Sequence, residues 1–458
     1  MTPVDLLIGG GRVVADNAVV EASVAVSGER IVALCSPDAA IPATQVVNAR
    51  GFYVLPGAID PHVHFKIFNS MVDDFTTAST AAAHGGVTTM MPFVSGDERM
   101  GVAEWIDYWI DEGRHQSVVD FAMHCRLRPD AALIDQVPDA IARGVTSVKM
   151  FQAYRKRGMM FSDDLLLRTL EIVARHGGLA MVHAENGWMI DHLEDRLVAS
   201  GRTGPEHYLA SRPHLAEGEA VARAITLAEI AGCPLYIVHL STREGLAAIA
   251  AARARGQHVY AETCPQYLYL TDAEMTRQKG LAKIAPPLRW DRDRDALWAG
   301  LDRGDVQTVG SDHAPFTVAD KLIGEKNIFD AGFGMPGIET MAPLLWSAGL
   351  KPGSLSLPQA VAALSENTAK IFGLYPKKGA IRIGSDADLV LLDPDAEWTI
   401  RGTELHSQAG YTCFEGRRVR GKVVASFLRG RPLLHDGKIQ QAPGYGQHVA
   451  RAASTDDQ

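Results

Sequence analysis

The stretch AIDPHVHF at residues 58–65 places two histidines at the end of an apolar segment of strand length. Side chains alternate between the two faces of a strand, so His62 and His64 lie on the same face, close enough to bind one ion. Seven further apolar segments follow, with helix-length amphipathic stretches between them. The eight expected strands are Ala58–Phe65, Val87–Phe93, Val118–Cys125, Ser147–Phe151, Leu179–Glu185, Leu235–Leu240, His258–Cys264 and Val306–His313. This alternation predicts βα units around a parallel sheet.

Eight βα units favour a closed (β/α)8 barrel of the TIM type, and an open doubly wound sheet is the alternative. The expected helices include Trp105–His115, Asp163–His176, Glu217–Gly232 and Arg243–Arg255. Both ends of the chain instead contain short β-strands separated by polar turns. We therefore predict an α/β protein with a small β-sandwich domain formed by both chain termini. The predicted boundaries are 1–56 and 380–440 for the β-sandwich, 57–379 for the barrel and 441–458 for a peripheral C-terminal tail.

The composition of the 458 residues is that of an ordinary globular protein, with 47% hydrophobic and 22% charged residues. A net charge of −9 provides no basic field for a nucleic-acid backbone. The five cysteines are scattered and form no CxxC pair, which argues against a disulfide framework. Neither a signal-like N-terminus nor an apolar segment of membrane-spanning length is found. We therefore expect a cytoplasmic protein that binds neither nucleic acid nor membrane.

Residues of metal-binding type occur at the ends of several expected strands. They are His62, His64, Lys149, His183, His239 and Asp312. Because active sites of barrel enzymes lie where the carboxyl ends of the strands meet, these side chains are expected at one mouth. Burying them without partners would cost on the order of several kcal/mol. A divalent metal ion is the simplest compensation.

Lys149 is the unusual member of this set, because an ammonium group next to divalent cations is repulsive. Burial can depress the pKa of a lysine and leave a neutral amine. Such an amine can add CO2 to become a carbamate, N6-carboxylysine, which is an anionic ligand able to bridge two ions. Two divalent ions with one carbamate, one aspartate and one hydroxide then carry a net charge of about +1. A salt bridge or a Schiff base is the alternative role for Lys149.

In this order the residues resemble the ligands of cyclic amidohydrolases of the amidohydrolase superfamily, most closely hydantoinases and dihydropyrimidinases. The resemblance covers nearly the whole chain. The matching motifs are PGAIDPHVH (56–64), GGVTT (85–89), SVKMFQAY (147–154), VHAEN (182–186), ETCPQY (262–267), APPLR (285–289), GSDH (310–313) and GSDADL (384–389).

The resemblance implies the same barrel and β-sandwich, together with a centre of two divalent ions. Zinc is expected first, with manganese, cobalt or iron as alternatives. The implied ligands are His62, His64 and Asp312 for one ion and His183 and His239 for the other, with carbamylated Lys149 between them. A bridging hydroxide would attack a ring amide carbonyl, and Asp312 would act as ligand and general base. Tyr154 would stabilise the oxyanion that forms.

The resemblance also implies that the ring is held by backbone groups near Ala285 and Pro336, where hydantoinases commonly have Ser and Asn. Pro336 can accept a backbone hydrogen bond but cannot donate one. An apolar wall suited to an aromatic or aliphatic ring substituent is expected in the loops after the strands. Its members are Phe65, Phe68, Met71, Phe93, Met159, Met160 and Phe161. Lys66 suggests a substrate with a carboxylate instead, because dihydroorotases have a carboxylate-binding arginine at this position. The alternative is that Lys66 is a solvated loop residue.

The expected activity is the hydrolytic opening of a cyclic amide or imide, with hydantoin or dihydropyrimidine rings first and an N-carbamoyl amino acid as the product. Allantoin and dihydroorotate are the next candidate substrates. A non-catalytic scaffold protein related to dihydropyrimidinases is a further alternative, which the intact set of ligand residues disfavours. The resemblance also implies a homo-oligomer, either a tetramer or a dimer.

Overall fold

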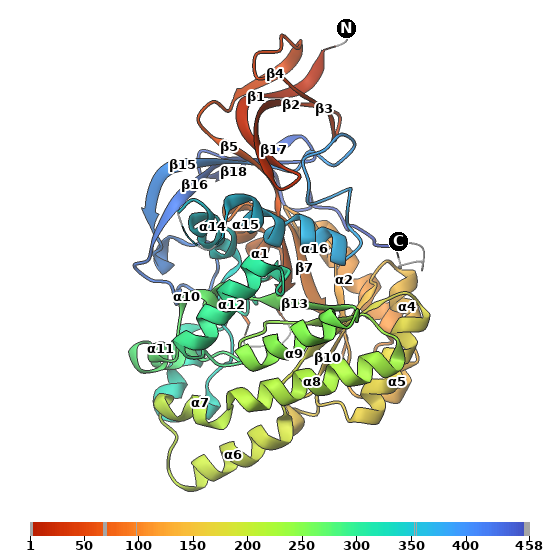
Figure 1. Cartoon of the computed structure of the whole chain (residues 1–458), viewed down its shortest axis with the longest axis vertical. Helices are drawn as coiled ribbons and strands as arrows, with labels where there is room; N and C mark the ends of the chain where they lie inside the picture. Colours follow the sequence, from red (N-terminus) through yellow and green to blue (C-terminus); the bar gives the residue numbers. More distant parts are fainter. Residues whose placement is uncertain (1–2, 67–70, 98, 352, 354, 453–458) are drawn as a thin grey trace.

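The computed structural model describes residues 3–66, 71–97, 99–351, 353 and 355–452. Figure 1 shows two bodies, a barrel surrounded by helices and a sheet seated at one end of it. The barrel strands are β6 (Ala58–Val63), β7 (Val87–Val94), β8 (Asp120–Phe121), β9 (His124–Arg126), β10 (Ser147–Phe151), β11 (Leu179–His183), β12 (Leu235–Ile237), β13 (Val259–Thr263) and β14 (Thr308–Val309).

The barrel strands are all parallel and hydrogen-bonded in the order β6-β7-β9-β10-β11-β12-β13-β14, with β8 also paired to β7. A parallel bridge between Val63 and His313 joins the first strand to the segment after the last one, which closes the barrel. The predicted (β/α)8 architecture is therefore confirmed. Several expected strands are shorter than predicted, and the expected strand Val118–Cys125 is divided into β8 and β9. β12 and β14 end before His239 and Asp312, whose positive φ angles of 39° and 49° take the backbone out of the ladder.

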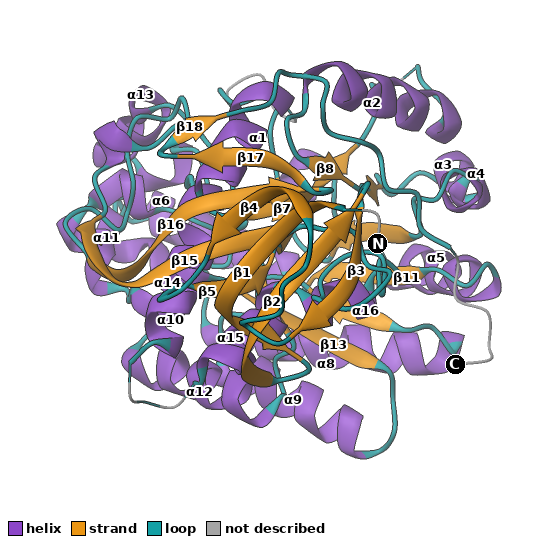
Figure 2. Ribbon diagram, turned by 90° about the horizontal axis from the view of Figure 1, so that it is seen from above, coloured by secondary structure: helices purple, strands orange, loops and turns teal. Residues whose placement is uncertain are grey.

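Helices cover the outside of the barrel, as Figure 2 shows. They are α1 (Phe75–His84), α2 (Val102–Gln116), α3 (Ala131–Ile134), α4 (Val137–Ala142), α5 (Asp163–Arg175), α6 (Gly187–Ala199), α7 (Tyr208–Ser211), α8 (His214–Ala231), α9 (Arg243–Ala254), α10 (Pro265–Tyr269), α11 (Ala273–Arg277), α12 (Asp291–Arg303), α13 (Val318–Leu322), α14 (Ile338–Gly349), α15 (Leu357–Leu364) and α16 (Glu366–Ile371). Local signals set several ends. Asp74 and Thr77 form a capping box at the start of α1, and Gly232 ends α8 in the left-handed conformation that glycine favours.

Both chain ends form the second body, as predicted. Its strands are β1 (Val4–Ala15), β2 (Ala18–Ser27), β3 (Arg30–Cys35), β4 (Ala43–Asn48), β5 (Tyr53–Pro56), β15 (Leu389–Thr399), β16 (Arg418–Leu428), β17 (Arg431–His435) and β18 (Lys438–Ile439). They make one continuous sheet in the order β18-β17-β16-β15-β5-β1-β2-β3, with β4 paired to β1. Antiparallel pairing of β5 with β15 joins the N-terminal strands to the C-terminal ones.

A buried ion cluster connects this sheet to the barrel. The ammonium of Lys378 lies 2.5 Å from Asp120 of β8 and 2.7 Å from Asp388, which precedes β15. Asp386 is a third partner at 2.9 Å, and Arg429 also binds Asp120. The charges of both bodies therefore neutralise one another at their junction.

The segment after β18 differs from the peripheral tail that the sequence suggested. The backbone of Phe121 donates to Gln447 and accepts from Val449, so this segment runs along the short strand β8. Arg451 is 4% exposed and donates to Ser147 and Met123. β8 is only two residues long, and the N–H and C=O groups of Phe121 form hydrogen bonds with the segment that leads to Ala452.

Candidate active site

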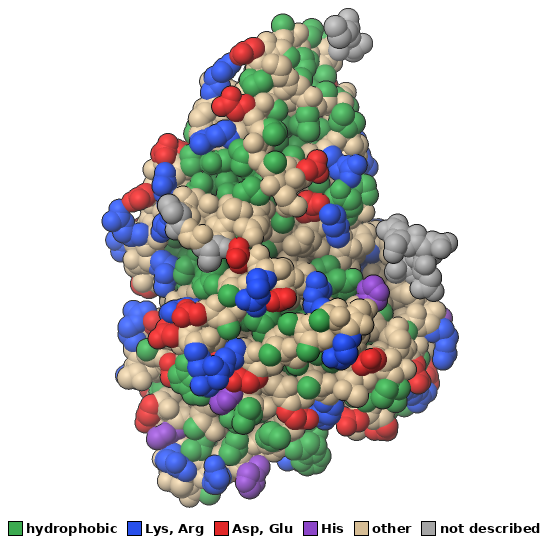
Figure 3. Space-filling model, in the orientation of Figure 1, with side chains coloured by type: hydrophobic (Ala, Val, Ile, Leu, Met, Phe, Trp, Pro, Cys, Tyr) green, Lys and Arg blue, Asp and Glu red, His purple; other side chains and the backbone are tan. Residues whose placement is uncertain are grey.

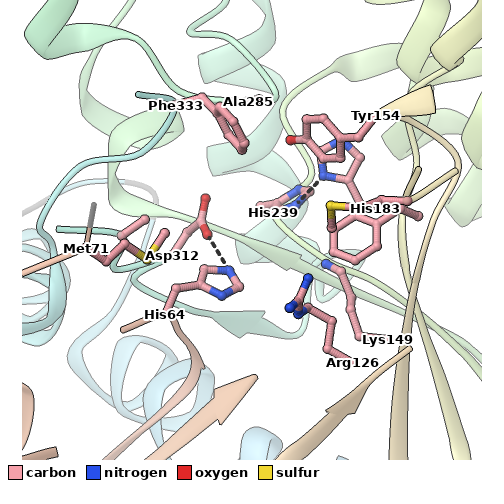
Figure 4. A pocket seen from close by; sticks show the side chains of 13 residues that line it. His64, Met71, Arg126, Lys149, Tyr154, His183, His239, Ala285, Asp312 and Phe333 are labelled. Atoms are coloured by element: carbon pink, nitrogen blue, oxygen red, sulfur yellow. Dashed lines mark hydrogen bonds and ion pairs between the residues drawn. The ribbon is translucent and has the colours of Figure 1, made fainter. Parts of the chain in front are cut away.

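A pocket lies at the carboxyl ends of the barrel strands, with a volume of about 520 Å³ including its opening to solvent (Figure 4). It is lined by His64, Met71, Arg126, Lys149, Phe151, Tyr154, Met159, His183, His239, Ala285, Asp312, Ala314 and Phe333. Five of the six predicted ligand residues are among them. The sixth, His62, is fully buried next to His64. The fold thus brings the whole predicted ligand set together.

His62, His64 and Asp312 form the first group of possible ligands. The Nε2 atoms of the two histidines lie 3.1 Å apart, and Asp312 Oδ1 lies 3.1 Å from His62 and 3.4 Å from His64. Metal–ligand bonds of about 2.0–2.2 Å in tetrahedral geometry place ligand atoms about 3.3–3.5 Å apart. The three atoms therefore have the spacing that one divalent ion requires.

His183 and His239 form the second group, with His183 Nδ1 3.0 Å from His239 Nε2. The Nδ1 atom of His239 is buried and finds no hydrogen-bond partner within the described part of the chain. Burial holds the pKa of His239 well below its usual value, so the imidazole is neutral and offers a lone pair. Buried neutral histidines at this spacing fit a metal ion better than a purely structural role.

Lys149 enters the pocket from β10 and is 1% exposed. Its ammonium lies 5.0 Å from the ring of Phe93 and 5.2 Å from that of Phe151. Burial lowers the pKa of Lys149 to about 7, so a large neutral fraction is present near neutral pH. The amine is thus chemically able to add CO2, as the carbamate hypothesis requires.

Two carboxylates that the sequence analysis did not single out orient the histidines. Glu262 of β13 accepts from His62 Nδ1 at 2.6 Å and from the backbone N–H of His239 at 3.0 Å. Glu185 lies 2.8 Å from His183 Nε2 and is itself paired with Arg212 at 2.5 Å. Such carboxylate–histidine pairs fix the ring orientation of metal ligands. Both glutamates occur in the motifs VHAEN and ETCPQY, at or near strand ends, and this position could have identified them as partners of the histidines.

The charges around His62 and Asp312 stabilise each other. Burial lowers the pKa of His62, but the charges of Glu262 and Asp312 outweigh burial and raise it to about 9. Burial raises the pKa of Asp312, but the charge of His62 and hydrogen bonds from both histidines hold it well below its usual value. By contrast, burial lowers the pKa of His64 to about 4. Asp312 is therefore an anion, the form in which a carboxylate binds a metal ion.

Tyr154 directs its hydroxyl into the pocket, and its ring stacks on Phe333 with centroids 5.2 Å apart (Figure 4). Burial raises the pKa of Tyr154 well above its usual value, which keeps the hydroxyl protonated as a donor. Its φ is +63°, and His239 and Asp312 also have positive φ. Such conformations cost about 1–3 kcal/mol each in non-glycine residues and concentrate at functional sites.

The predicted substrate-binding residues lie in different parts of the structure. Ala285 lines the pocket, whereas Pro336 lines a separate cavity with His313 and Gly337. Phe65 packs on Phe75 in the core, with ring centroids 4.7 Å apart. The side chain of Lys66 is 47% exposed and lies 4.0 Å from Asp74, away from the pocket lining.

Other members of the predicted apolar wall lie partly at the pocket and partly in the core. Met71 and Met159 line the pocket, while Phe161 is in the core. Phe93 packs beneath the histidines, with its ring centroid 4.6 Å from that of His62. Phe68 lies outside the described residues.

Arg126 and Phe333 line the pocket although the sequence analysis did not identify them. Arg126 is paired in register with Lys149 across β9 and β10, so both side chains point the same way, and it donates to Ser95 at 2.5 Å. Phe333 comes from an irregular loop, where no periodic pattern marks its direction.

No helix in the described part of the chain is long and apolar enough to cross a membrane.

A (β/α)8 barrel that gathers four histidines, an aspartate and a buried lysine at its mouth defines the class of barrel hydrolases with a metal-type centre. The chain belongs to the amidohydrolase family, whose model matches residues 53–433. Its relatives place it in the hydantoinase/dihydropyrimidinase group, which confirms the resemblance carried by the motifs.

Three relatives illustrate the similarity. The chain is 38% identical to a D-hydantoinase of Rhizobium radiobacter over 456 residues, covering 98% of this chain and 99% of the relative. It is 36% identical to a D-phenylhydantoinase of Escherichia coli over 413 residues, covering 88% and 89% of the two chains. The crystal structure of a dihydropyrimidinase from Brevibacillus agri NCHU1002 superposes with a TM-score of 0.94 at 36% identity, covering 98% of this chain and 99% of that one.

Proposed function

We propose that the protein hydrolyses a ring amide bond of hydantoins or dihydropyrimidines and releases the ring-opened N-carbamoyl amino acid. The observation that carries this proposal is the spacing of His62, His64 and Asp312 in the pocket beside Lys149, in a chain similar over its full length to D-hydantoinases. Acidic and basic side chains are interspersed on the face shown in Figure 3, which suits a small substrate better than a polyanion.

The residues present fit a centre of two divalent ions, with zinc as the first choice. His62, His64 and Asp312 would hold one ion, and His183 and His239 the other. Lys149 would bridge them after its neutral amine attacks CO2, forming an N–C bond and losing one proton to leave an anionic carbamate. Bound divalent ions supply hydroxide at neutral pH and polarise a carbonyl group. The spacing of the ligand atoms supports this assignment.

The chain's own residues supply proton transfer and stabilisation of charge. Asp312 stays anionic and can accept the proton of the attacking hydroxide at a carboxylate oxygen, then return it to the leaving ring nitrogen. The hydroxyl of Tyr154 can donate a hydrogen bond to the oxyanion that forms at the attacked carbon. The backbone near Ala285 can hold the imide edge of the ring.

The pocket lining supports a ring that carries an apolar substituent. Met71, Phe151, Met159 and Phe333 provide apolar and aromatic surface beside the polar centre. Lys66 lies at the surface, so it gives no support to recognition of a substrate carboxylate. Allantoin and dihydroorotate remain the second candidates.

A ring-opening assay on zinc- or manganese-loaded protein tests the function. The substrates are 5-phenylhydantoin, unsubstituted hydantoin, dihydrouracil, allantoin and dihydroorotate at matched concentrations. We expect 5-phenylhydantoin to have the highest kcat/KM. Preference for dihydroorotate or allantoin would contradict the proposed substrate class, and absence of any ring opening would contradict the proposed function.

We further propose that the protein is a cytoplasmic homo-oligomer, a tetramer or a dimer. Its five cysteines are free and four of them are buried, which suits a reducing compartment. Sedimentation velocity of the purified chain measures the oligomeric state, and a monomer at micromolar concentration would contradict it.

A further inference from the structure

A second group of metal-ligand side chains lies outside the pocket. It consists of His84, Glu339 and His406, each of which offers a ligand atom within 4.8 Å of the others. His84 is the last residue of α1, Glu339 lies in the first turn of α14, and His406 follows the short 3-10 helix Gly402–Glu404. Three distant parts of the sequence thus bring two imidazoles and one carboxylate together.

The backbone holds His84 next to Glu339 through a close approach at Gly85. A Cβ atom on Gly85 would lie 2.6 Å from the carbonyl oxygen of Glu339, so a larger residue would push α1 away from α14. The proximity of the two side chains therefore follows from helix packing and does not depend on the flexibility of long side chains.

His406 completes the group from the segment after the 3-10 helix Gly402–Glu404. Its backbone N–H donates to Glu339 Oε2 at 2.7 Å, and its Nδ1 lies 2.9 Å from Oε1. Its ring stacks on that of His84 with centroids 3.4 Å apart and an angle of 10° between the planes. The glutamate thus fixes one imidazole, and that imidazole faces the other.

His84 has the properties of a ligand that is ready to bind. Burial, together with the neighbouring His406, lowers the pKa of His84 to about 4, so its imidazole is neutral at physiological pH. Within the described part of the chain its side chain makes no hydrogen bond, and its ring contact is with His406. A neutral imidazole with a free lone pair is the form that coordinates metals.

We propose that His84, Glu339 and His406 bind one divalent transition-metal ion, with zinc best matched to the two nitrogens and one carboxylate oxygen. Zinc bonds of about 2.0–2.2 Å place the ligand atoms about 3.3–3.5 Å apart, so the group must contract by about 1.5 Å at most. An imidazole binds in its own plane, so the stacked rings tilt on binding. The side chain of His406 is 39% exposed, which leaves a path for the ion and room for water as a fourth ligand.

This site is independent of the proposed active centre but structurally connected to it. Ser407 and Gln408, next to His406, donate to Asp73 at 2.5 Å and 2.9 Å. Asp73 also pairs with His313 at 3.0 Å, the residue after Asp312. A bound ion therefore joins α1, α14 and the 402–408 segment, and we assign it a stabilising role rather than a chemical one.

The first experiment counts ions per chain. Wild type, His84→Gln and His406→Gln are saturated with zinc, passed through a weak chelator and measured by plasma mass spectrometry. We expect wild type to retain one more zinc per chain than either variant. Because the result is a difference between proteins, it holds whatever the number of ions in the pocket.

His115→Gln is the matched control. His115 lies on α2, is exposed, and contacts Asp111 of its own helix. We expect its zinc content to equal that of wild type. Equal zinc content in all four proteins would overturn the proposal, as would an equal loss in the control.

A second measurement does not depend on the variants folding. Crystals of wild-type protein soaked in zinc are examined at the zinc absorption edge. An anomalous peak about 2.0–2.2 Å from ligand atoms of His84, Glu339 and His406 is expected. Density without a peak there, in crystals whose pocket is occupied by zinc, would overturn the proposal while leaving the proposed function intact.

Discussion

Glu262 accepts a hydrogen bond from Nδ1 of His62 at 2.6 Å, with both side chains fully buried. The same carboxylate receives the backbone N–H of His239 and the hydroxyl of Tyr236. One buried carboxylate therefore holds the ring of His62 and the backbone of His239, and so links the two groups of candidate ligands.

Glu262→Gln is expected to weaken metal binding. The amide keeps the shape but loses the charge that orients His62 and stabilises its donated proton. We expect metal affinity to fall about 10–100-fold, measured by competition with a coloured chelator. Glu397→Gln, at an exposed pair with Arg418, serves as the control and keeps wild-type affinity. Unchanged affinity in Glu262→Gln would contradict the orienting role.

Lys149→Ala is expected to abolish ring opening and reduce the metal content of the pocket. Without the amine no carbamate forms, and the two ligand groups lose their bridge. Short carboxylic acids added to the variant should restore part of the activity, because they can occupy the place of the carbamate. Ring opening at the wild-type rate without added acid would exclude the carbamate hypothesis.

Tyr154→Phe is expected to lower kcat about 10²–10³-fold with little change in KM, because the hydroxyl acts on charge that develops only during reaction. Steady-state kinetics on 5-phenylhydantoin measure both constants. Tyr108→Phe, at an exposed tyrosine, is the control. A large rise in KM at constant kcat would instead assign Tyr154 to ground-state binding.

Lys378→Met is expected to destabilise the protein by about 3–5 kcal/mol, because it removes the buried cation that Asp120, Asp386 and Asp388 share. Burial lowers the pKa of Lys378, but the charges of the three aspartates outweigh burial and raise it above its usual value. When folding raises the pKa of a lysine, its charge stabilises the folded protein. This stabilisation is fully present below the pKa of the unfolded chain, 10.5, and is lost as the pH rises through the pKa of the folded protein.

The decisive measurement is the pH dependence of the stability difference between wild type and Lys378→Met. Urea unfolding of wild type and Lys378→Met at several pH values yields the difference in the free energy of unfolding. We expect it to stay constant from about pH 7 to about pH 10 and to shrink above that range. A difference that stays constant from about pH 10 to about pH 12 would show that the pKa of Lys378 is not raised.

Tertiary structure corrected the sequence interpretation mainly in the loops. Phe65, in the segment after β6, looked like part of a substrate wall but packs in the core. Phe93, which lies within β7, packs beneath the histidines. A loop has no repeating pattern, so the direction of its side chains depends on distant segments. The same reason hid Phe333, whose loop approaches the pocket only after the barrel closes.

The sequence by itself determined the barrel, the terminal sheet and the set of candidate ligand residues. Strands and helices have periods of two and about 3.6 residues, and the ligand residues sit at strand ends, so local pattern was sufficient for them. Only the tertiary structure decided which carboxylates orient the ligands, that Tyr154, His239 and Asp312 adopt positive φ, and that His84 meets His406. These features arise from contacts between residues far apart in the chain, which exist only once the barrel has closed and both termini have packed against it.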